Sequence, residues 1–380
     1  MAMEISPPQV AEIASSTYPL RTSTDMRTAW ALMPTAGEGF DVRGGKRLVG
    51  VTGVGVQKRS GFGYVAWGQG ARQGECLIAV RGTDSGPDWL SNFRFGGVIG
   101  PSGYVVHVGF WRGAQSVLPQ IRQQLRGRNP TALHVVGHSL GGAMATLIAD
   151  SLSNMGCPMK LYTFGAPRCG VEGHAEYLTS KLGAENIYRA YHDTDPVPMV
   201  PPFPYFHVPY GSNAYRLKGA GTLVSVPSHL MPSYRASVEG CTWSSLPVIL
   251  PKHNSFEAAS EWLSQASKDS GPFIMMSATA LRLILSALDW IVKQIGRSAA
   301  LQLFADATLL DGLARLLYSG ALMSIELGEA IGNLMNAALR FMGRTAIAAA
   351  SMTATFIEYV LGMLFHFIAA IARRAIDMLD

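Results

Sequence analysis

The sequence predicts an α/β fold, in which a mostly parallel sheet carries helices on its faces, followed by an all-helical region. Two observations predict the α/β part. Short apolar, β-branched runs alternate with amphipathic helical patterns, and one such run enters a glycine-flanked serine turn that leads into an alanine-rich helix. The helical region is predicted because the strand pattern stops near residue 268 while helical periodicity continues. We therefore predict two domains, residues 1–268 and 269–380.

The predicted elements follow one another along the chain. Residues 9–32 have helical spacing, and the candidate inward positions are Val10, Ile13, Ala14, Met26, Ala29 and Trp30. Strands are predicted at 47–51, 63–67, 76–80, 133–136, 160–165 and 186–191, and helices at about 114–125 and from 140. The glycines between 50 and 56 do not match a dinucleotide-binding fingerprint leading into a helix, so no nucleotide site is predicted.

The segment 137–142, Gly-His-Ser-Leu-Gly-Gly, is the most informative stretch. A strand before it and a helix after it form the context of a nucleophile elbow, a sharp turn that presents a serine at its tip. The flanking glycines are needed because the turn packs the following helix closely against the strand. We therefore predict that Ser139 is a nucleophile.

Composition limits the classes of function. The chain is 48% hydrophobic and 15% charged, with a net charge of +5. Since no lysine-rich or arginine-rich run occurs, we expect weak electrostatic steering and no nucleic-acid partner. The four cysteines have no metal-ligand spacing, and neither a metal nor a cofactor is predicted. The first residues lack a basic leader and an apolar core, which predicts a cytoplasmic or membrane-associated protein, exported only by a non-classical route.

Several separated motifs, taken in order, resemble those of the fungal-type class 3 lipases, a family with the α/β-hydrolase fold. The resemblance covers about residues 45–240 and rests on the segments 81–83, 106–110, 137–142, 164–168, 195–198 and 206–208. It implies a serine esterase that acts on glycerolipids, with its triad in the order serine, acid, histidine.

Candidates for the acid and the base follow the serine in the chain. Asp195 stands where the resembling lipases carry the acid, with Asp193 as the alternative. His229 lies in a segment that resembles the family's histidine motif. Of the other candidates, His207 resembles a structural histidine and His253 is expected on a loop surface. We predict that Asp195 orients His229, which deprotonates the serine.

The tetrahedral intermediate of ester cleavage needs two N–H donors for its oxyanion. The backbone of Leu140, directly after the serine, is predicted to supply one, and the resemblance implies that Thr83 supplies the other. The segment 84–94 occupies the place of the family's lid, and within it Trp89 and Phe93 lie four residues apart on one helical face. With His138, they are predicted to bind substrate.

The last hundred residues are apolar helices, each with one polar edge. In the first of them, the polar stripe consists of Arg282, Ser286, Asp289, Lys293 and Arg297. The stretch between Arg344 and Arg373 is long enough to cross a hydrocarbon core of roughly 30 Å. Alternatively, one face of it could line a bundle interior, namely Ser351, Thr355, Glu358, Gly362 and His366. Three interpretations remain: membrane association, a helical bundle buried against the hydrolase or a sister subunit, and a partner-binding region.

The sequence thus predicts a lipase or phospholipase that works at membranes through an acyl-enzyme on Ser139. Its expected partners are a lipid or phospholipid substrate and a membrane surface, with a homo-oligomer or a bound protein as further possibilities. The alternative hypothesis is a helical effector that permeabilises membranes, with the hydrolase part as its scaffold.

Overall fold

The structure is a computed structural model that describes residues 4–52, 58–82, 96–211, 214–249, 262–266, 274–296, 308–345 and 352–379. A single large sheet forms its centre, with strands in the order β1-β2-β3-β6-β7-β8-β9-β10. Their bounds are β1 Phe40–Thr52, β2 Lys58–Gly68, β3 Glu75–Val80, β6 Ala132–His138, β7 Met159–Phe164, β8 Ile187–His192, β9 Ala214–Leu217 and β10 Val248–Ile249. The strands from β3 to β9 are parallel, and β1, β2 and β10 pair antiparallel at the edges. The predicted α/β fold with a mostly parallel sheet is confirmed.

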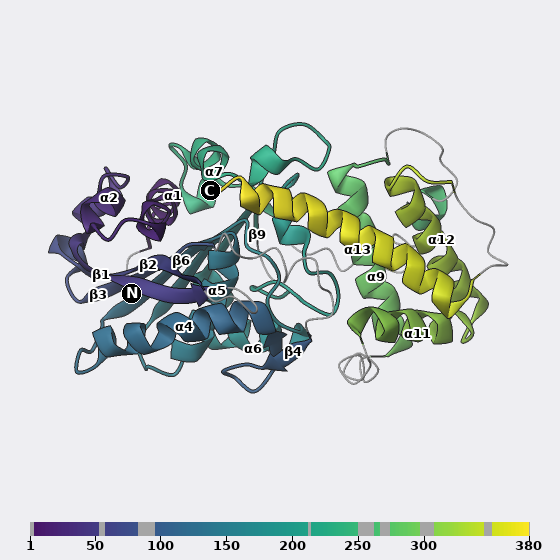
Figure 1. Cartoon of the computed structure of the whole chain (residues 1–380), viewed down its shortest axis with the longest axis horizontal. Helices are drawn as coiled ribbons and strands as arrows, with labels where there is room; N and C mark the ends of the chain where they lie inside the picture. Colours follow the sequence, from purple (N-terminus) through teal and green to yellow (C-terminus); the bar gives the residue numbers. More distant parts are fainter. Residues whose placement is uncertain are drawn as a thin grey trace.

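Helices cover both faces of this sheet (Figure 1). Along β3, Cys76 and Ile78 pack into the core beneath α4 (Val108–Leu125) and α5 (Leu140–Leu152). The alternate residues Leu77 and Ala79 pack into the opposite core, which contains α1 (Pro7–Ser16) and α7 (Met231–Val238). A strand that is buried on both faces has a continuous run of apolar residues, and this pattern is what predicted these strands from the sequence.

Two details of the first elements differ from prediction. Five of the six candidate inward residues between 9 and 32 are buried, but Trp30, at the end of α2 (Met26–Trp30), is 38% exposed. Its ring instead stacks under the guanidinium of Arg43, 3.5 Å from the ring centroid. In addition, α4 begins at Val108, because the side chain of His107 accepts the N–H of Gly109 and caps the helix.

The C-terminal region is helical, as predicted, and its described long helices are α9 (Ala278–Ile295), α11 (Leu309–Ala321), α12 (Ile325–Phe341) and α13 (Ala354–Asp377). Their apolar faces pack against one another and belong to the same core cluster as one face of the sheet. The polar stripe of α9 faces the α/β part of the chain, and its predicted last member, Arg297, lies outside the described residues. Arg282 donates to the backbone oxygen of Asp193, and Lys293 Nζ lies 3.1 Å from Glu172 Oε1.

Helix α13 runs diagonally across the right-hand half of the molecule in the view of Figure 1 and brings the C-terminus beside α7. Within the part of the chain that the structure describes, it alone is long and apolar enough to cross a membrane, with 39% of its apolar window buried. The alternative in which its polar face lines a bundle interior holds for only part of that face. Thr355 and His366 are exposed, whereas Glu358 and Gly362 are partly buried. A Cβ added at Gly362 would lie 3.3 Å from Leu310 of α11. Ser351 lies outside the described residues.

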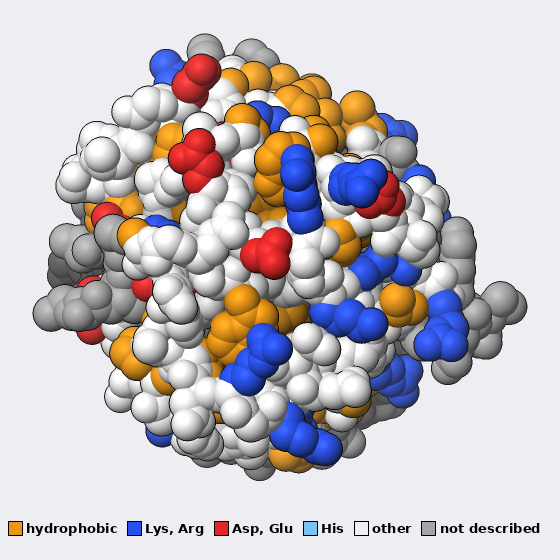
Figure 2. Space-filling model, turned by 90° about the vertical axis from the view of Figure 1, so that its left-hand side faces the viewer, with side chains coloured by type: hydrophobic (Ala, Val, Ile, Leu, Met, Phe, Trp, Pro, Cys, Tyr) orange, Lys and Arg blue, Asp and Glu red, His pale blue; other side chains and the backbone are white. Residues whose placement is uncertain are grey.

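Figure 2 shows the end of the molecule that carries the N-terminal helices. Its Lys and Arg side chains are separated by uncharged surface and form no continuous basic patch on this face. This distribution is consistent with the weak steering inferred from the net charge.

Candidate active site

The serine turn connects β6 to α5 and places Ser139 between them. Its backbone has φ +58° and ψ −134°, a left-handed conformation that is strained for a residue with a side chain. A Cβ added at Gly137 would lie 2.2 Å from the oxygen of Gly141, and one at Gly141 would lie 2.4 Å from the oxygen of Val80. Both glycines are therefore required by close backbone packing, which fits the elbow geometry.

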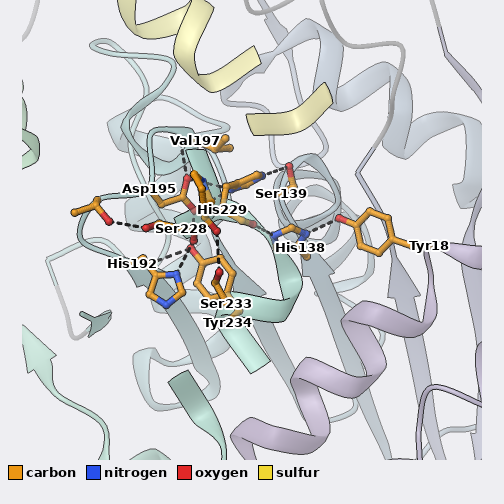
Figure 3. A network of polar contacts seen from close by, with 12 residues as sticks. Tyr18, His138, Ser139, His192, Asp195, Val197, Ser228, His229, Ser233 and Tyr234 are labelled. Carbon is orange, nitrogen blue, oxygen red and sulfur yellow. Dashed lines mark hydrogen bonds and ion pairs between the residues drawn. The ribbon is translucent and has the colours of Figure 1, made fainter. Parts of the chain in front are cut away.

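The structure brings three predicted residues together in one hydrogen-bonded chain (Figure 3). Ser139 Oγ lies 2.8 Å from His229 Nε2, and His229 Nδ1 lies 2.8 Å from Asp195 Oδ2. Ser139 precedes α5, Asp195 follows β8, and His229 ends the short helix η6 (Val226–His229). Each of the three side chains is fully buried. In such an arrangement a serine can act as a nucleophile, the imidazole next to it as a base, and the carboxylate as the group that orients the base.

Further groups hold the carboxylate of Asp195. Its Oδ1 accepts the backbone N–H of Val197 at 2.9 Å, and its Oδ2 accepts the hydroxyl of Tyr234 at 2.6 Å. Burial and the adjacent Asp195 charge raise the pKa of Tyr234 well above its ordinary value, so the phenol remains a donor. A Cβ at Gly165 would lie 2.8 Å from Asp195 Oδ2 and 3.1 Å from His229 Nδ1, so these groups pack directly onto its backbone.

His138 does not line a substrate site, contrary to the prediction. It is fully buried, and its Nε2 donates to the backbone oxygen of His229 at 2.8 Å, while its Nδ1 accepts the hydroxyl of Tyr18. Burial and then the neighbouring His229 lower its pKa well below the ordinary value, so the ring stays neutral. The two imidazole rings stack with centroids 4.8 Å apart. His138 therefore holds the backbone of His229 in place. The hydrogen bond by which Tyr18 holds His138 was not predicted from the sequence.

The oxyanion donors can be placed only in part. The N–H of Leu140 lies in the first turn of α5, where N–H groups have no acceptor within the helix. A Cβ at Gly82 would lie 3.3 Å from Ser139 Cβ and 3.5 Å from the nitrogen of Leu140, so glycine leaves room beside the nucleophile. Thr83, Trp89 and Phe93 lie outside the described residues.

The alternative candidates are engaged elsewhere. Asp193 Oδ1 accepts the N–H of Gly219 at 2.8 Å, while His207 Nε2 donates to the oxygen of Pro198 at 2.8 Å. Burial and nearby arginines lower the pKa of His207 well below its ordinary value, which fits its predicted structural role. His253 lies outside the described residues. In the described ranges, no group of His, Cys, Asp and Glu side chains could hold a metal ion.

The parallel sheet, the strained serine turn and the Ser139–His229–Asp195 chain define an α/β-hydrolase fold with a serine-type site. Residues 77–205 match the family model described as Lipase (class 3). The resemblance inferred from the motifs is thereby confirmed for residues 77–205.

Individual relatives match over part of their length. The chain is 39% identical over 165 residues to a secreted mono- and diacylglycerol lipase of Fusarium solani, covering 41% of this chain and 49% of that protein. A secreted mono- and diacylglycerol lipase of Penicillium cyclopium is 31% identical over 205 residues, covering 52% and 64%. The chain thus spans between about half and two thirds of these relatives.

Solved structures of similar proteins include a mono- and diacylglycerol lipase from Aspergillus oryzae. It is 23% identical, with a TM-score of 0.45, and the match covers 64% of this chain and 84% of that one. A lipase from Rhizopus microsporus var. chinensis is 25% identical, with a TM-score of 0.43, covering 57% and 74%.

The predicted location is contradicted by these comparisons. The cytoplasmic or membrane-associated placement rested on the absence of a leader among the first residues, yet the relatives from Fusarium and Penicillium are named as secreted lipases. A local feature of the N-terminus was therefore a poor guide to location.

Proposed function

We propose that this protein is an exported serine hydrolase that cleaves carboxylic ester bonds of glycerolipids through an acyl-enzyme on Ser139. The observation that carries the proposal is the continuous hydrogen-bonded chain from Ser139 Oγ through His229 to Asp195. A serine hydroxyl is a weak nucleophile unless a base takes its proton and a third group orients that base, and all three functions are present here.

In the first half of the reaction, Ser139 Oγ attacks the ester carbonyl carbon as its proton passes to His229 Nε2. The resulting imidazolium is stabilised by the carboxylate of Asp195, which also accepts from Val197 and Tyr234. When the tetrahedral intermediate collapses, His229 gives the proton to the leaving alcohol and the acyl group remains on Ser139. Water, deprotonated by the same imidazole, then releases the fatty acid.

The negative charge of the tetrahedral intermediate develops on the former carbonyl oxygen. The N–H of Leu140, at the start of α5, is the donor that the described residues offer, and it benefits from the positive end of the helix dipole. The second donor is the predicted Thr83. Losing one such donor costs about a hundredfold or more in turnover.

Glycerolipid esters are the proposed substrates because similar proteins carry the names of mono- and diacylglycerol lipases. Phospholipids remain part of the proposal as a second group of substrates. The alternative of a membrane-permeabilising effector has less support, since α9, α11, α12 and α13 bury their apolar faces against one another and against the hydrolase part.

The test is mass spectrometry of a defined mixture of monoacylglycerol, diacylglycerol and phospholipid after incubation with the protein. Wild type is expected to release fatty acid, and Ser139→Ala is expected to be about a millionfold slower. Ser233→Ala is the matched control, because Ser233 is partly exposed and its hydroxyl donates to the oxygen of Pro227, outside the triad. Equal release by wild type and Ser139→Ala would refute the role of Ser139, and the lipid that is consumed first identifies the preferred head group.

A further inference from the structure

The three side chains of the proposed triad are sealed from solvent. Ser139, Asp195 and His229 each have 0% exposed surface. An ester must place its carbonyl carbon next to Ser139 Oγ, within about 3.5 Å, before attack. Some part of the protein that lies over the site must therefore move before the reaction can begin.

Helix α13 lies against both segments that carry the acid and the base. It packs on η6, which ends at His229, and on η5 (Val197–Met199), which begins two residues after Asp195. Val197 and Met199 are buried in the same apolar core as the α13 residues Ile368 and Ala372. The yellow ribbon of the C-terminal helix crosses the upper part of the close-up, above Val197 and Ser139 (Figure 3).

The last residues of the chain continue this contact. Met378 and Leu379 line a mostly apolar groove of about 520 Å³. Its other walls come from the N-terminal helical segment and from the residues after the catalytic histidine: Ser15, Tyr18, Leu230, Met231, Pro232 and Arg235. The C-terminal end of the protein thus lies beside Tyr18, which supports His138, and beside Leu230, which directly follows His229.

Besides its apolar packing, the helical region meets the hydrolase part through polar contacts. Lys293 on α9 pairs with Glu172 at 3.1 Å and contacts the hydroxyl of Tyr210 at 3.1 Å, and Lys293 is about one-third exposed. Asp289 lies 3.9 Å from Arg168. A partly exposed pair such as Lys293–Glu172 contributes little, typically about 0.2–1 kcal/mol, whereas the pair of Asp289 and Arg168 is more buried.

We propose that α13 with the C-terminal residues 378–379 is an intramolecular cover of the active site, and that it has to move away before an ester reaches Ser139. This inference rests on the proposed function, because it concerns access to the same nucleophile. It gives the C-terminal helices a role in controlling that access, independent of any membrane span.

The first test loosens the cover at its end. Leu379→Lys places an ammonium group in an apolar groove that already contains Arg235, which disfavours the closed state. We expect a soluble fluorophosphonate to label Ser139 about tenfold faster than in wild type, and a soluble short-chain ester to be cleaved faster by a similar factor. Leu322→Lys is the control, because Leu322 is 72% exposed and caps the C-terminal end of α11, outside the groove that holds Leu379.

The second test weakens the docking of α9 and serves if Leu379→Lys does not fold. Lys293→Met removes the contact with Glu172 and is expected to raise the labelling rate about two- to fivefold. Lys181→Met makes the same change in charge at an exposed position and should leave the rate unchanged. Equal labelling of Ser139 in wild type and in both loosened variants would refute the cover and leave the proposed function intact. Absence of Ser139 labelling in every variant would refute the proposed function itself.

Discussion

Gly165 is the position where a single methyl group tests the geometry of the site most directly. It lies after β7 with φ +54°, a conformation that L side chains rarely adopt. A Cβ there would lie 2.8 Å from Asp195 Oδ2, 2.9 Å from Tyr234 Oη and 3.1 Å from His229 Nδ1. These are the atoms that hold the acid and the base in line, so Gly165→Ala pushes on the triad without removing any of its members.

The expected magnitude follows from two separate costs. The left-handed backbone costs a residue with a side chain roughly 1–2 kcal/mol, and overpacking adds about 1–3 kcal/mol. The carboxylate and the imidazole must each give way by several tenths of an ångström, and a misplacement on the order of 1 Å costs about a hundredfold in rate. We therefore expect kcat/KM to fall about 100- to 1000-fold, with a loss of unfolding free energy of about 2–5 kcal/mol.

The assay is hydrolysis of a soluble ester, paired with denaturant unfolding of the same preparation. Gly70→Ala is the matched control, because Gly70 has φ +57° and a Cβ there meets nothing within 4 Å. Gly70→Ala should lose only the roughly 1–2 kcal/mol of unfolding free energy that the left-handed backbone costs, and it should keep the wild-type kcat/KM. If Gly165→Ala retains wild-type kcat/KM while Gly70→Ala is destabilised as expected, the packing of the triad onto residue 165 does not control its alignment and the reasoning fails.

Three further predictions concern hydrogen bonding and pH. Tyr234→Phe removes the hydroxyl that donates to Asp195, a charge-assisted hydrogen bond worth about 1.5–3 kcal/mol. We therefore expect kcat/KM to fall about 10- to 100-fold while a phosphonate still labels Ser139. An undiminished kcat/KM would show that the phenol is dispensable. Burial raises the pKa of Asp289 to about 6, so the charged carboxylate is disfavoured in the folded state. In urea titrations at pH 7.5, we expect Asp289→Asn to be about 1–3 kcal/mol more stable than wild type. This stability difference should shrink as the pH falls from 6 towards 4, where the carboxyl group becomes protonated. Burial lowers the pKa of His107 to about 3, so below pH 6.5 the unfolded chain takes up a proton that the folded chain does not. Between pH 6.5 and 4.5, wild type should therefore lose about 2–3 kcal/mol of unfolding free energy that His107→Gln keeps. Parallel profiles of unfolding free energy against pH for the two proteins would contradict this.

The elements around the nucleophile could be predicted because their causes are local. The apolar run of β6, the glycines of the elbow and the alanine-rich α5 are adjacent in the chain, and each restricts the same short stretch of backbone. Asp195 and His229 were selected by a resemblance to a family, and the structure places both within hydrogen-bond distance of their expected partners. Their catalytic roles remain predictions.

The contacts that the sequence could not predict join residues far apart in the chain. Tyr18 meets His138 across 120 positions, and nothing in the helical spacing of the N-terminal segment distinguishes it from any other half-buried tyrosine. His138 stands next to the nucleophile, which suggested contact with substrate. In a strand buried on both faces, however, the side chain before the turn points into the protein, and there it supports the backbone of His229.

The C-terminal helices show why a polar stripe alone does not reveal what covers it. Periodicity predicted a polar edge and an apolar face on α9, and both exist. A polar edge is equally compatible with water and with a charged protein surface, however, and here it meets Asp193, Arg168 and Glu172 of the hydrolase part. Because the polar edge of α9 docks on the hydrolase part and the apolar faces pack in the bundle and on η5 and η6, part of the apolar composition that suggested a membrane partner is accounted for within the chain. The same arrangement fixes α13 over the segments that carry the acid and the base, which makes access to Ser139 depend on how firmly α9 is docked.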